Sequence, residues 1–328
     1  MTTSPRKLGS TGPTVFPLGL GCMGMSGMYG PADEQESIAT IHAALDAGVT
    51  LLDTGDYYGM GHNELLIGRA LRDRRDRALV SVKFGALRTP DGAWTGVDTR
   101  PVAIRNFIAY TLVRLGLDYV DIYRPGRLDP AVPIEETVGA LAELVKRGYV
   151  RHIGLSEVGA ETVRRAAAVH PIADLQIEYS LVSRRPEENV FPTLVELGVG
   201  VTAYGVLSRG LLAGSRPAAR GDFRSYLPRF KGPNRERNDK LVATLEQLAA
   251  ERGAKASQLA IAWVLAKGES IVPLVGARTR AQLADALGAL QLALSAEDVA
   301  RIEQALPPAA VAGTRYDPQQ MAHLDSER

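Results

Sequence analysis

The chain alternates short apolar runs with amphipathic segments, and this alternation constrains the fold more than any other feature of its 328 residues. Between most apolar runs lies a segment whose hydrophobic side chains recur at helical spacing. Eight runs have the length and composition of buried strands: residues 17–21, 49–53, 78–83, 119–123, 150–155, 172–178, 200–204 and 271–274. Strands that alternate with helices pair in parallel, so we predict an α/β fold of the (β/α)8 TIM-barrel class.

Local signals support the helices of this repeat. Asp33 and Glu36 have the spacing of a capping box ahead of an apolar stripe, and Gly48 is placed to end that helix. Pro133 precedes a second helix at a position where its missing N–H costs little.

The chain shows no linker that would divide it, and we expect one domain over residues 1–328. Two segments depart from the plain repeat. Residues 205–237 form a long basic stretch rich in glycine and proline, and residues 307–328 form a polar tail. In a barrel, such loops shape the pocket at the carboxyl ends of the strands.

The composition excludes several classes of protein. The 38 basic and 37 acidic residues leave a net charge of +1, which gives no reason to expect a nucleic-acid or membrane partner. Cys22 is the only cysteine, so an internal disulfide framework and a multi-thiolate metal site are both excluded, and we expect no bound metal. With no signal-like start and no apolar run of about 20 residues, we expect a cytoplasmic protein.

Three chemically capable residues follow or end successive strands. Asp53 and Lys83 each close an apolar run, and Tyr58 follows Asp53 by five residues. If these strands are neighbours in a barrel, the three side chains meet at one mouth. A neighbouring ammonium is expected to lower the pKa of the phenol and make Tyr58 a proton donor to a carbonyl oxygen. The alternative is a structural ion pair beside a tyrosine that packs at the rim.

Sequence motifs around these residues resemble those of the aldo-keto reductase superfamily. Residues 53–64 read DTGDYYGMGHNE, similar to the family pattern D-T-A-x-x-Y-G-x-x-x-N-E with Gly55 for alanine. The stretches 153–156, 175–180 and 203–210 resemble two later strands and a loop of the same family. The resemblance covers nearly the whole chain. It implies NADPH-dependent reduction of a small aldehyde or ketone, with Asp53, Tyr58 and Lys83 as three members of a catalytic tetrad and Tyr58 as the acid.

The resemblance also implies a set of cofactor contacts. Ser156 and Gln176 correspond to residues that bind the nicotinamide carboxamide, Tyr204 to the residue that stacks under the ring, and Gly21 and Met23 to residues beside the cofactor. The remaining implied contacts are Asp53 itself and the pyrophosphate loop Gly205, Leu207, Ser208, Arg209 and Gly210.

A last segment resembles the family's site for the adenosine 2′-phosphate. Residues 275–285 combine a helix start with two arginines, which suits an extra phosphate group. By resemblance the contacts are Gly276, Arg278, Gln282 and Asp285, with aspartate standing where the family prefers glutamate. The alternative is an ordinary solvated helix start.

The sequence departs from the family at one catalytic position. The fourth strand of relatives reads D-L-Y-x-x-H-R-x-D-P, and here Gly126 occupies the place of the histidine that orients the substrate carbonyl. Loss of one such donor typically costs on the order of 10²–10³ in rate, so we expect a slower or more selective enzyme. His62 is a poor substitute, because its loop tip is expected to point away. Four aromatic residues fall on loops at the expected mouth and are candidates to line the pocket: Tyr29, Tyr57, Phe84 and Trp94.

Two other functions stay open. The missing histidine is compatible with an NADPH-binding regulatory or oligomeric subunit that has weak catalysis. A barrel lyase that forms a Schiff base on Lys83 is the second alternative. The outer helices of a barrel can also pair in a homo-oligomer, which no sequence signature marks.

Overall fold

The computed structural model describes residues 4–217 and 222–327 and contains a closed barrel of eight parallel strands. This confirms the predicted (β/α)8 class. The strands follow one another around the barrel in the order β10-β11-β12-β3-β4-β5-β8-β9. Their bounds are β3 (Gly19–Gly21), β4 (Leu51–Gly55), β5 (Leu79–Phe84), β8 (Val120–Pro125), β9 (Val150–Ser156), β10 (Ile172–Glu178), β11 (Gly200–Tyr204) and β12 (Ile271–Gly276).

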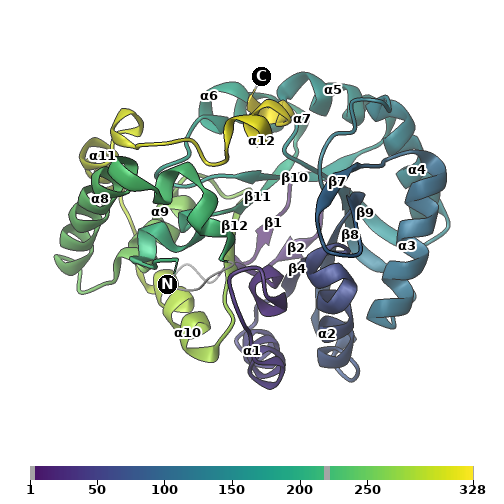
Figure 1. Ribbon diagram of the computed structural model, residues 1–328, viewed down its shortest axis with the longest axis horizontal. Helices are drawn as coiled ribbons and strands as arrows, with labels where there is room; N and C mark the ends of the chain where they lie inside the picture. The colour runs from purple at the N-terminus through teal and green to yellow at the C-terminus, as the bar shows by residue number, and fades with distance from the viewer. Residues whose placement is uncertain (1–3, 218–221, 328) are drawn as a thin grey trace.

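Helices surround the strands, as Figure 1 shows. The helices are α1 (Glu34–Asp46), α2 (His62–Ala70), α3 (Pro101–Leu115), α4 (Ile134–Lys146), α5 (Ala160–Val169), α6 (Pro186–Asn189), α7 (Phe191–Leu197), α8 (Gly232–Ala250), α9 (Ala256–Ala266), α10 (Arg280–Gly288), α11 (Ala296–Ala305) and α12 (Pro318–Ala322). In the described part of the chain, no helix is both long and apolar enough to cross a membrane.

The start of α1 shows half of the predicted capping box. The Asp33 carboxylate accepts a hydrogen bond of 2.7 Å from the Glu36 N–H. The Glu36 carboxylate, however, reaches across to α10, where it accepts from the Arg280 N–H at 2.9 Å. The prediction of a reciprocal box was therefore wrong, because a tertiary partner takes the glutamate.

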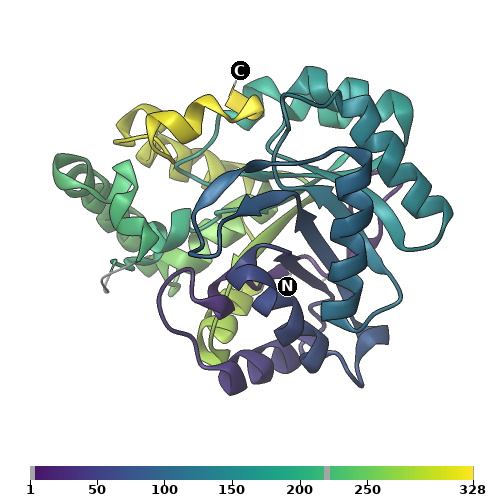
Figure 2. The ribbon, with the colours of Figure 1, turned by 45° about the vertical axis from the view of Figure 1, so that its right-hand side comes forward.

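Two hairpins lie outside the barrel, and neither was predicted. The first pairs β1 (Arg6–Lys7) with β2 (Thr14–Val15), and Arg6 donates to the Leu265 and Ile271 carbonyls. The second pairs β6 (Ala86–Arg88) with β7 (Trp94–Val97), directly after β5. Figure 2 shows this second hairpin in blue, projecting from the barrel strands. The segment around Trp94 is thus a strand pair where only a loop was expected.

The two segments that depart from the strand–helix repeat, residues 205–237 and 307–328, contain regular turns and helices. Three 3₁₀ turns lie within residues 205–237, and α8 begins at Gly232, earlier than the predicted start near Asp239. Residues 218–221 of this predicted loop lie outside the described residues. The described tail after residue 307 carries a 3₁₀ turn at Pro308–Ala310, the helix α12 and a second 3₁₀ turn at Asp325–Glu327.

A column of polar side chains runs through the barrel interior. Arg124 and Asp174, both fully buried, form an ion pair with an N–O distance of 3.1 Å. Arg124 also donates to the Ser81 hydroxyl at 3.1 Å, and Ser81 donates to Asp53 at 2.8 Å. Gly154 makes room for this column, since a Cβ there would lie 2.6 Å from an Asp174 oxygen. The column connects the barrel interior to the predicted catalytic aspartate.

Candidate active site

Asp53 and Lys83 form a buried ion pair at the carboxyl ends of two adjacent strands. Asp53 lies on β4 and Lys83 on β5, and their side chains are 3% and 4% exposed. The other Asp53 oxygen accepts hydrogen bonds from Ser81 at 2.8 Å and from the Gln176 amide at 2.7 Å. A buried charge is stable only when it is paired and hydrogen-bonded, and this carboxylate has three donors.

Tyr58 lies beside this pair in the turn that follows β4. Its side chain is buried, and the Lys83 ammonium lies 5.1 Å from the centre of its ring. Burial, followed by the negative charge of Asp53, raises the pKa of Tyr58 well above its usual value. The expected lowering of this pKa was therefore wrong, because desolvation of the phenol and the charge of Asp53 outweigh the groups that favour the phenolate. The phenol stays protonated at neutral pH, which is the state a proton donor needs.

Gly126 lies at the same mouth, immediately after β8. Its N–H donates to the Phe84 carbonyl at 2.8 Å. A Cβ built on Gly126 would lie 3.4 Å from both Cε1 and the hydroxyl oxygen of Tyr57. The fold therefore brings position 126 into the neighbourhood of the acid–lysine–phenol group, and another tyrosine lies against it.

The predicted nicotinamide contacts are grouped at the ends of the next strands. Ser156 ends β9, and its hydroxyl is buried with no hydrogen-bond partner within residues 4–217 and 222–327. Gln176 is committed to Asp53 through its amide nitrogen. The Tyr204 hydroxyl donates to Glu157 at 2.7 Å. An orphaned buried hydroxyl is costly unless a ligand satisfies it, so Ser156 fits a carboxamide-binding role.

The predicted pyrophosphate loop follows β11 and turns tightly. Ser208 and Arg209 have positive φ values of 45° and 56°. The N–H groups of Ser208 and Gly210 donate to the Gly205 and Leu207 carbonyls within the loop. The Arg209 guanidinium pairs with Glu178 at 3.0 Å. The loop holds its cation at the barrel mouth, and its contact with a pyrophosphate stays a prediction.

The two arginines of the predicted 2′-phosphate segment are bound to protein acceptors. Arg278 donates to the Tyr29 and Pro31 carbonyls, each at 3.2 Å. Arg280 binds Glu36 through its N–H at 2.9 Å and through its guanidinium at 2.9 and 3.2 Å. Arg280 is therefore paired with a carboxylate, whereas the Arg278 guanidinium donates to neutral carbonyl groups.

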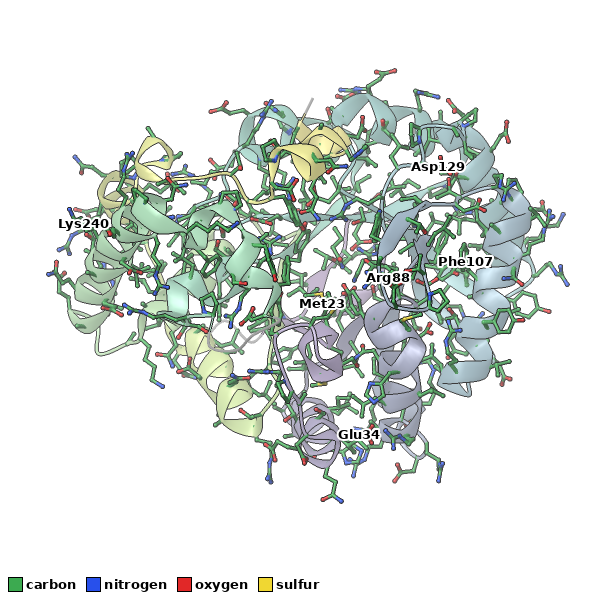
Figure 3. The ribbon with its side chains drawn as sticks, in the orientation of Figure 1. Met23, Glu34, Arg88, Phe107, Asp129 and Lys240 are labelled. Carbon is green, nitrogen blue, oxygen red and sulfur yellow. The ribbon has the colours of Figure 1, made fainter. Side chains whose placement is uncertain are left out.

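The other predicted contacts of the 2′-phosphate segment interact with different elements of the fold. Gly276 pairs with Gly21 across β12 and β3, and the Gln282 side chain accepts from the Arg278 N–H at 2.8 Å. Met23 lies near the middle of the molecule in Figure 3, while Glu34 and Lys240 lie toward its edge. Asp285 accepts from Ser257 at 2.7 Å, which turns it toward α9.

A hollow lies beside the start of α9, between α8 and α10. It has a volume of about 420 Å³ and is lined by Ala213, three residues after the predicted pyrophosphate loop, and by Asp285 on α10. Glu246 and Lys255 contribute further polar groups. Of the residues that line this hollow, Asp285 alone is a predicted cofactor contact.

Comparison with known proteins shows the family of this chain. The model of the aldo/keto reductase family matches residues 17–307. The chain belongs to the aldo-keto reductase family. It is 41% identical to "Probable aldo-keto reductase 1" of Glycine max over 95% of this chain and 91% of that protein. It is 38% identical to the aldo-keto reductase yakc [NADP(+)] of Schizosaccharomyces pombe over 97% and 96% of the two chains.

Solved structures give the same result. The glycerol dehydrogenase AKR11B4 of Gluconobacter oxydans superposes with a TM-score of 0.84 at 31% identity, over 94% of this chain and 97% of that chain. The aldo-keto reductase AKR11C1 of Bacillus halodurans superposes with a TM-score of 0.78 at 28% identity, over 93% and 97%. The reductase barrel described above is thus shared along nearly the full length of both proteins.

Sequence reasoning missed how this aldo-keto reductase anchors its tail. Arg315 is buried and donates to both oxygens of Glu157, at 2.7 and 2.6 Å. Burial acts to raise the pKa of Glu157, but Arg315 holds that pKa well below its ordinary value. Tyr316, the next residue, has its hydroxyl 3.2 Å from that of Tyr204. No short-range pattern links Glu157 to Arg315, which lies 158 residues further along the chain.

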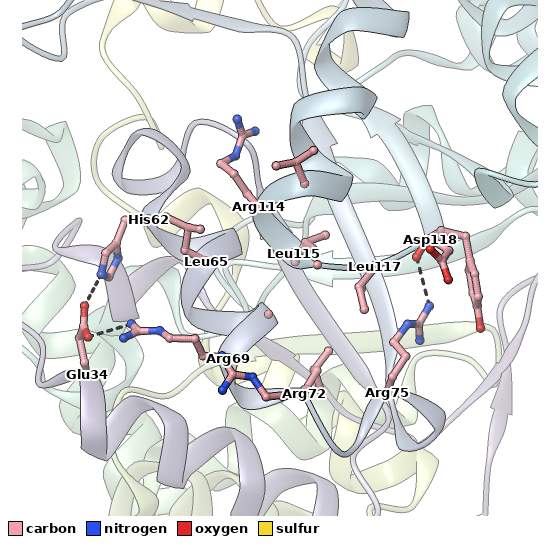
Figure 4. Close-up of a pocket in the computed structure, with 15 residues that line it drawn as sticks. Glu34, His62, Leu65, Arg69, Arg72, Arg75, Arg114, Leu115, Leu117 and Asp118 are labelled. Atoms are coloured by element: carbon pink, nitrogen blue, oxygen red, sulfur yellow. Dashed lines mark hydrogen bonds and ion pairs between the residues drawn. The ribbon is translucent and has the colours of Figure 1, made fainter.

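A larger groove lies outside the barrel of this reductase. It has a volume of about 740 Å³ and is lined by α2, α3 and the segments that follow them (Figure 4). His62 lies in it and forms a 2.7 Å contact with Glu34, which also pairs with Arg69. His62 therefore faces the outer helices and does not replace the missing histidine.

Proposed function

We propose that this aldo-keto reductase uses NADPH to reduce small aldehydes or ketones, with Tyr58 as the proton donor. The observation that carries the proposal is the buried Asp53–Lys83 pair beside a protonated phenol at the barrel mouth. The pair is fixed by Ser81 and Gln176, so the position of the ammonium is set before any substrate enters.

When bound, the nicotinamide supplies the hydride that adds to the carbonyl carbon. As the C=O electron pair moves to the oxygen, the O–H bond of Tyr58 breaks and its proton forms the new alcohol O–H bond. The Lys83 ammonium, 5.1 Å from the Tyr58 ring centre, offsets the negative charge left on the phenol. Asp53 holds Lys83 in that position.

Three features support NADPH as the cofactor. The relative in fission yeast is named as an NADP(+) enzyme. Ser156 offers the carboxamide a buried hydroxyl that has no hydrogen-bond partner among the described residues. Arg278 and Arg280 precede and begin α10, where guanidinium groups and backbone N–H groups suit an extra phosphate.

The first experiment is a fluorescence titration of the protein with NADPH, followed by absorbance loss on addition of an aromatic aldehyde. Saturable binding with oxidation supports the proposal. Binding without oxidation across a panel of carbonyl compounds favours a regulatory subunit. Absence of binding contradicts the cofactor assignment.

A Schiff-base lyase is a weaker candidate. Lys83 is buried and donates to Asp53, whereas a Schiff base needs a free amine that meets the substrate. Borohydride trapping of a carbonyl compound on Lys83 would support the lyase and contradict the reductase proposal.

A further inference from the structure

The Tyr57 ring lies between two glycines that both depart from the family pattern. A Cβ built on Gly55 would lie 3.3 Å from Cε1 and 3.4 Å from Cζ of Tyr57. A Cβ built on Gly126 would lie 3.4 Å from Cε1 and 3.4 Å from the hydroxyl oxygen of the same residue. Tyr57 thus lies against the space that side chains at both positions would enter.

The two departures therefore have one physical explanation. The family pattern has alanine where this chain has Gly55 and histidine where it has Gly126, and glycine at both positions makes room for the Tyr57 ring. At Gly55 the distance of 3.3 Å is already tighter than an ordinary contact, so even an alanine methyl would press on Tyr57. At Gly126 the first atom of any side chain touches the ring, and an imidazole adds five more.

The surroundings fix the Tyr57 ring. It packs edge to face on Tyr58, with ring centroids 4.9 Å apart and an interplanar angle of 80°. It also packs edge to face on Trp94 of the β6–β7 hairpin, at 6.1 Å and 89°. Such pairs stabilise a defined geometry, and Tyr57 is therefore held next to the proposed acid.

The Tyr57 hydroxyl keeps its proton. Burial raises the pKa of Tyr57 above its usual value, and the nearby phenol of Tyr58 acts in the same direction. Lys83 and Arg127 act in the opposite direction without overcoming burial. A phenol that stays neutral at working pH remains a hydrogen-bond donor.

We propose that the Tyr57 hydroxyl is a second hydrogen-bond donor to the substrate carbonyl oxygen and takes over the role that a histidine at position 126 has in relatives. This inference rests on the proposed carbonyl reduction. As negative charge develops on the oxygen, Tyr58 transfers its proton while Tyr57 keeps its own and donates a hydrogen bond. One such donor contributes on the order of 10²–10³ in rate, so Tyr57 offsets the loss of the histidine.

Tyr57→Phe tests the proposal because it removes the hydroxyl and keeps the ring. We expect kcat for an aromatic aldehyde to fall about 100-fold. The NADPH Kd and the aldehyde KM should stay within twofold. The isotope effect with NADPH deuterated at the transferred position should increase, since the loss is in the chemical step. Tyr110→Phe on α3, which removes an exposed hydroxyl far from the barrel interior, is the matched control and should leave all four values unchanged.

The outcomes separate the two proposals. If Tyr57→Phe keeps kcat within twofold of the unmodified enzyme, the role of Tyr57 is refuted while carbonyl reduction stands. A rise in KM with kcat unchanged also refutes it, because Tyr57 then only shapes the pocket. If the unmodified enzyme binds NADPH but oxidises it with no carbonyl compound, the proposed function fails first.

A second pair of variants decides the question if Tyr57→Phe does not fold. Tyr57→Ala opens the space against position 126, and Gly126→His is then added to it. We expect the double variant to turn over at least tenfold faster than Tyr57→Ala alone, because the imidazole restores a donor. Gly126→His alone should not increase kcat, since Tyr57 still lies against that space. No gain in the double variant would overturn the proposal.

Discussion

The two ends of the proposed cofactor site hold their charges in different ways. At the reaction end, Asp53 and Lys83 are buried, and Asp53 receives hydrogen bonds from two further side chains. At the adenosine end, the Arg280 side chain is 63% exposed and binds a Glu36 side chain that is 27% exposed. The same kinds of charged group are thus enclosed at one end and open to water at the other.

This difference in burial indicates how rigidly each end of the site holds its charged groups when a ligand binds. A buried ion pair whose partners are fixed by other hydrogen bonds cannot rearrange cheaply, so the fold itself sets the reacting geometry. An exposed pair contributes about 0–1 kcal/mol and can exchange partners. We therefore expect rigid positioning at the reaction end and exchange of Glu36 for a phosphate at the adenosine end.

Removing the proposed acid is the strongest test of the reaction end. Tyr58→Phe should lower kcat about a thousandfold, because general-acid catalysis typically contributes 10²–10⁴. The NADPH Kd should not change. Tyr149→Phe, which alters a tyrosine at the other end of the barrel, just before β9, is the control. Retention of a tenth or more of kcat in Tyr58→Phe would show that another group supplies the proton.

Breaking the buried pair tests its rigidity. Lys83→Met leaves Asp53 buried without its cation, and we expect the free energy of unfolding to fall by about 3 kcal/mol. Asp53→Asn combined with Lys83→Met should recover much of this loss, because no uncompensated charge remains. Urea unfolding of the three proteins measures the effect. Equal stability of the single and double variants would mean that the pair is accessible to water.

Asp56 tests whether a buried carboxyl near the reaction end lowers the free energy of unfolding. It is 8% exposed, and burial, followed by the charge of Glu64, raises its pKa from 3.8 to about 7. Below pH 3.8 the carboxyl is protonated in both states. Between pH 3.8 and about 7 the unfolded chain releases the proton more readily, so stability falls as pH rises, and the penalty is complete above about 7.

Asp56→Asn should therefore stabilise the protein at pH 8 by about 2 kcal/mol, an advantage that disappears below pH 4. Thermal unfolding between pH 4 and pH 8 measures it. Asp91→Asn is the control, because hydrogen bonding to Thr89 lowers the pKa of that exposed aspartate and the trend there should be weak and opposite. A gain for Asp56→Asn that does not depend on pH would contradict the explanation.

Glu36→Gln gives the smallest expected effect and tests the adenosine end. Weakening the contact with Arg280 should improve the Kd for 2′,5′-ADP up to about fivefold, with the Kd for 5′-ADP unchanged. Glu34→Gln on the same helix is the control, because Glu34 pairs with His62 and Arg69. Calorimetric titration measures both ligands. Weaker binding of 2′,5′-ADP in Glu36→Gln would mean that Glu36 instead orients Arg280 for the phosphate.

The eight strands and most of the helices could be predicted because they rest on short-range patterns. Apolar runs ending at Asp53 and Lys83 mark strand ends, and parallel pairing brings strand ends to one mouth. The β6–β7 hairpin was missed because its strands have only three and four residues, and it is stabilised by contacts such as that of Trp94 with Tyr57. The partner of Glu157 was equally hidden, since Arg315 lies 158 residues further along the chain.

The sequence by itself determined the barrel, the acid–lysine–phenol group and the family. The apolar periodicity and the motif at residues 53–64 both depend on residues that are close together in the chain. Only the tertiary structure decided how each side chain is used. It placed Tyr57 between Gly55 and Gly126, gave Glu36 to α10 and raised the pKa of Tyr58 through burial. Solvent exclusion and contacts between distant segments produce these effects, and neither is encoded at a single position.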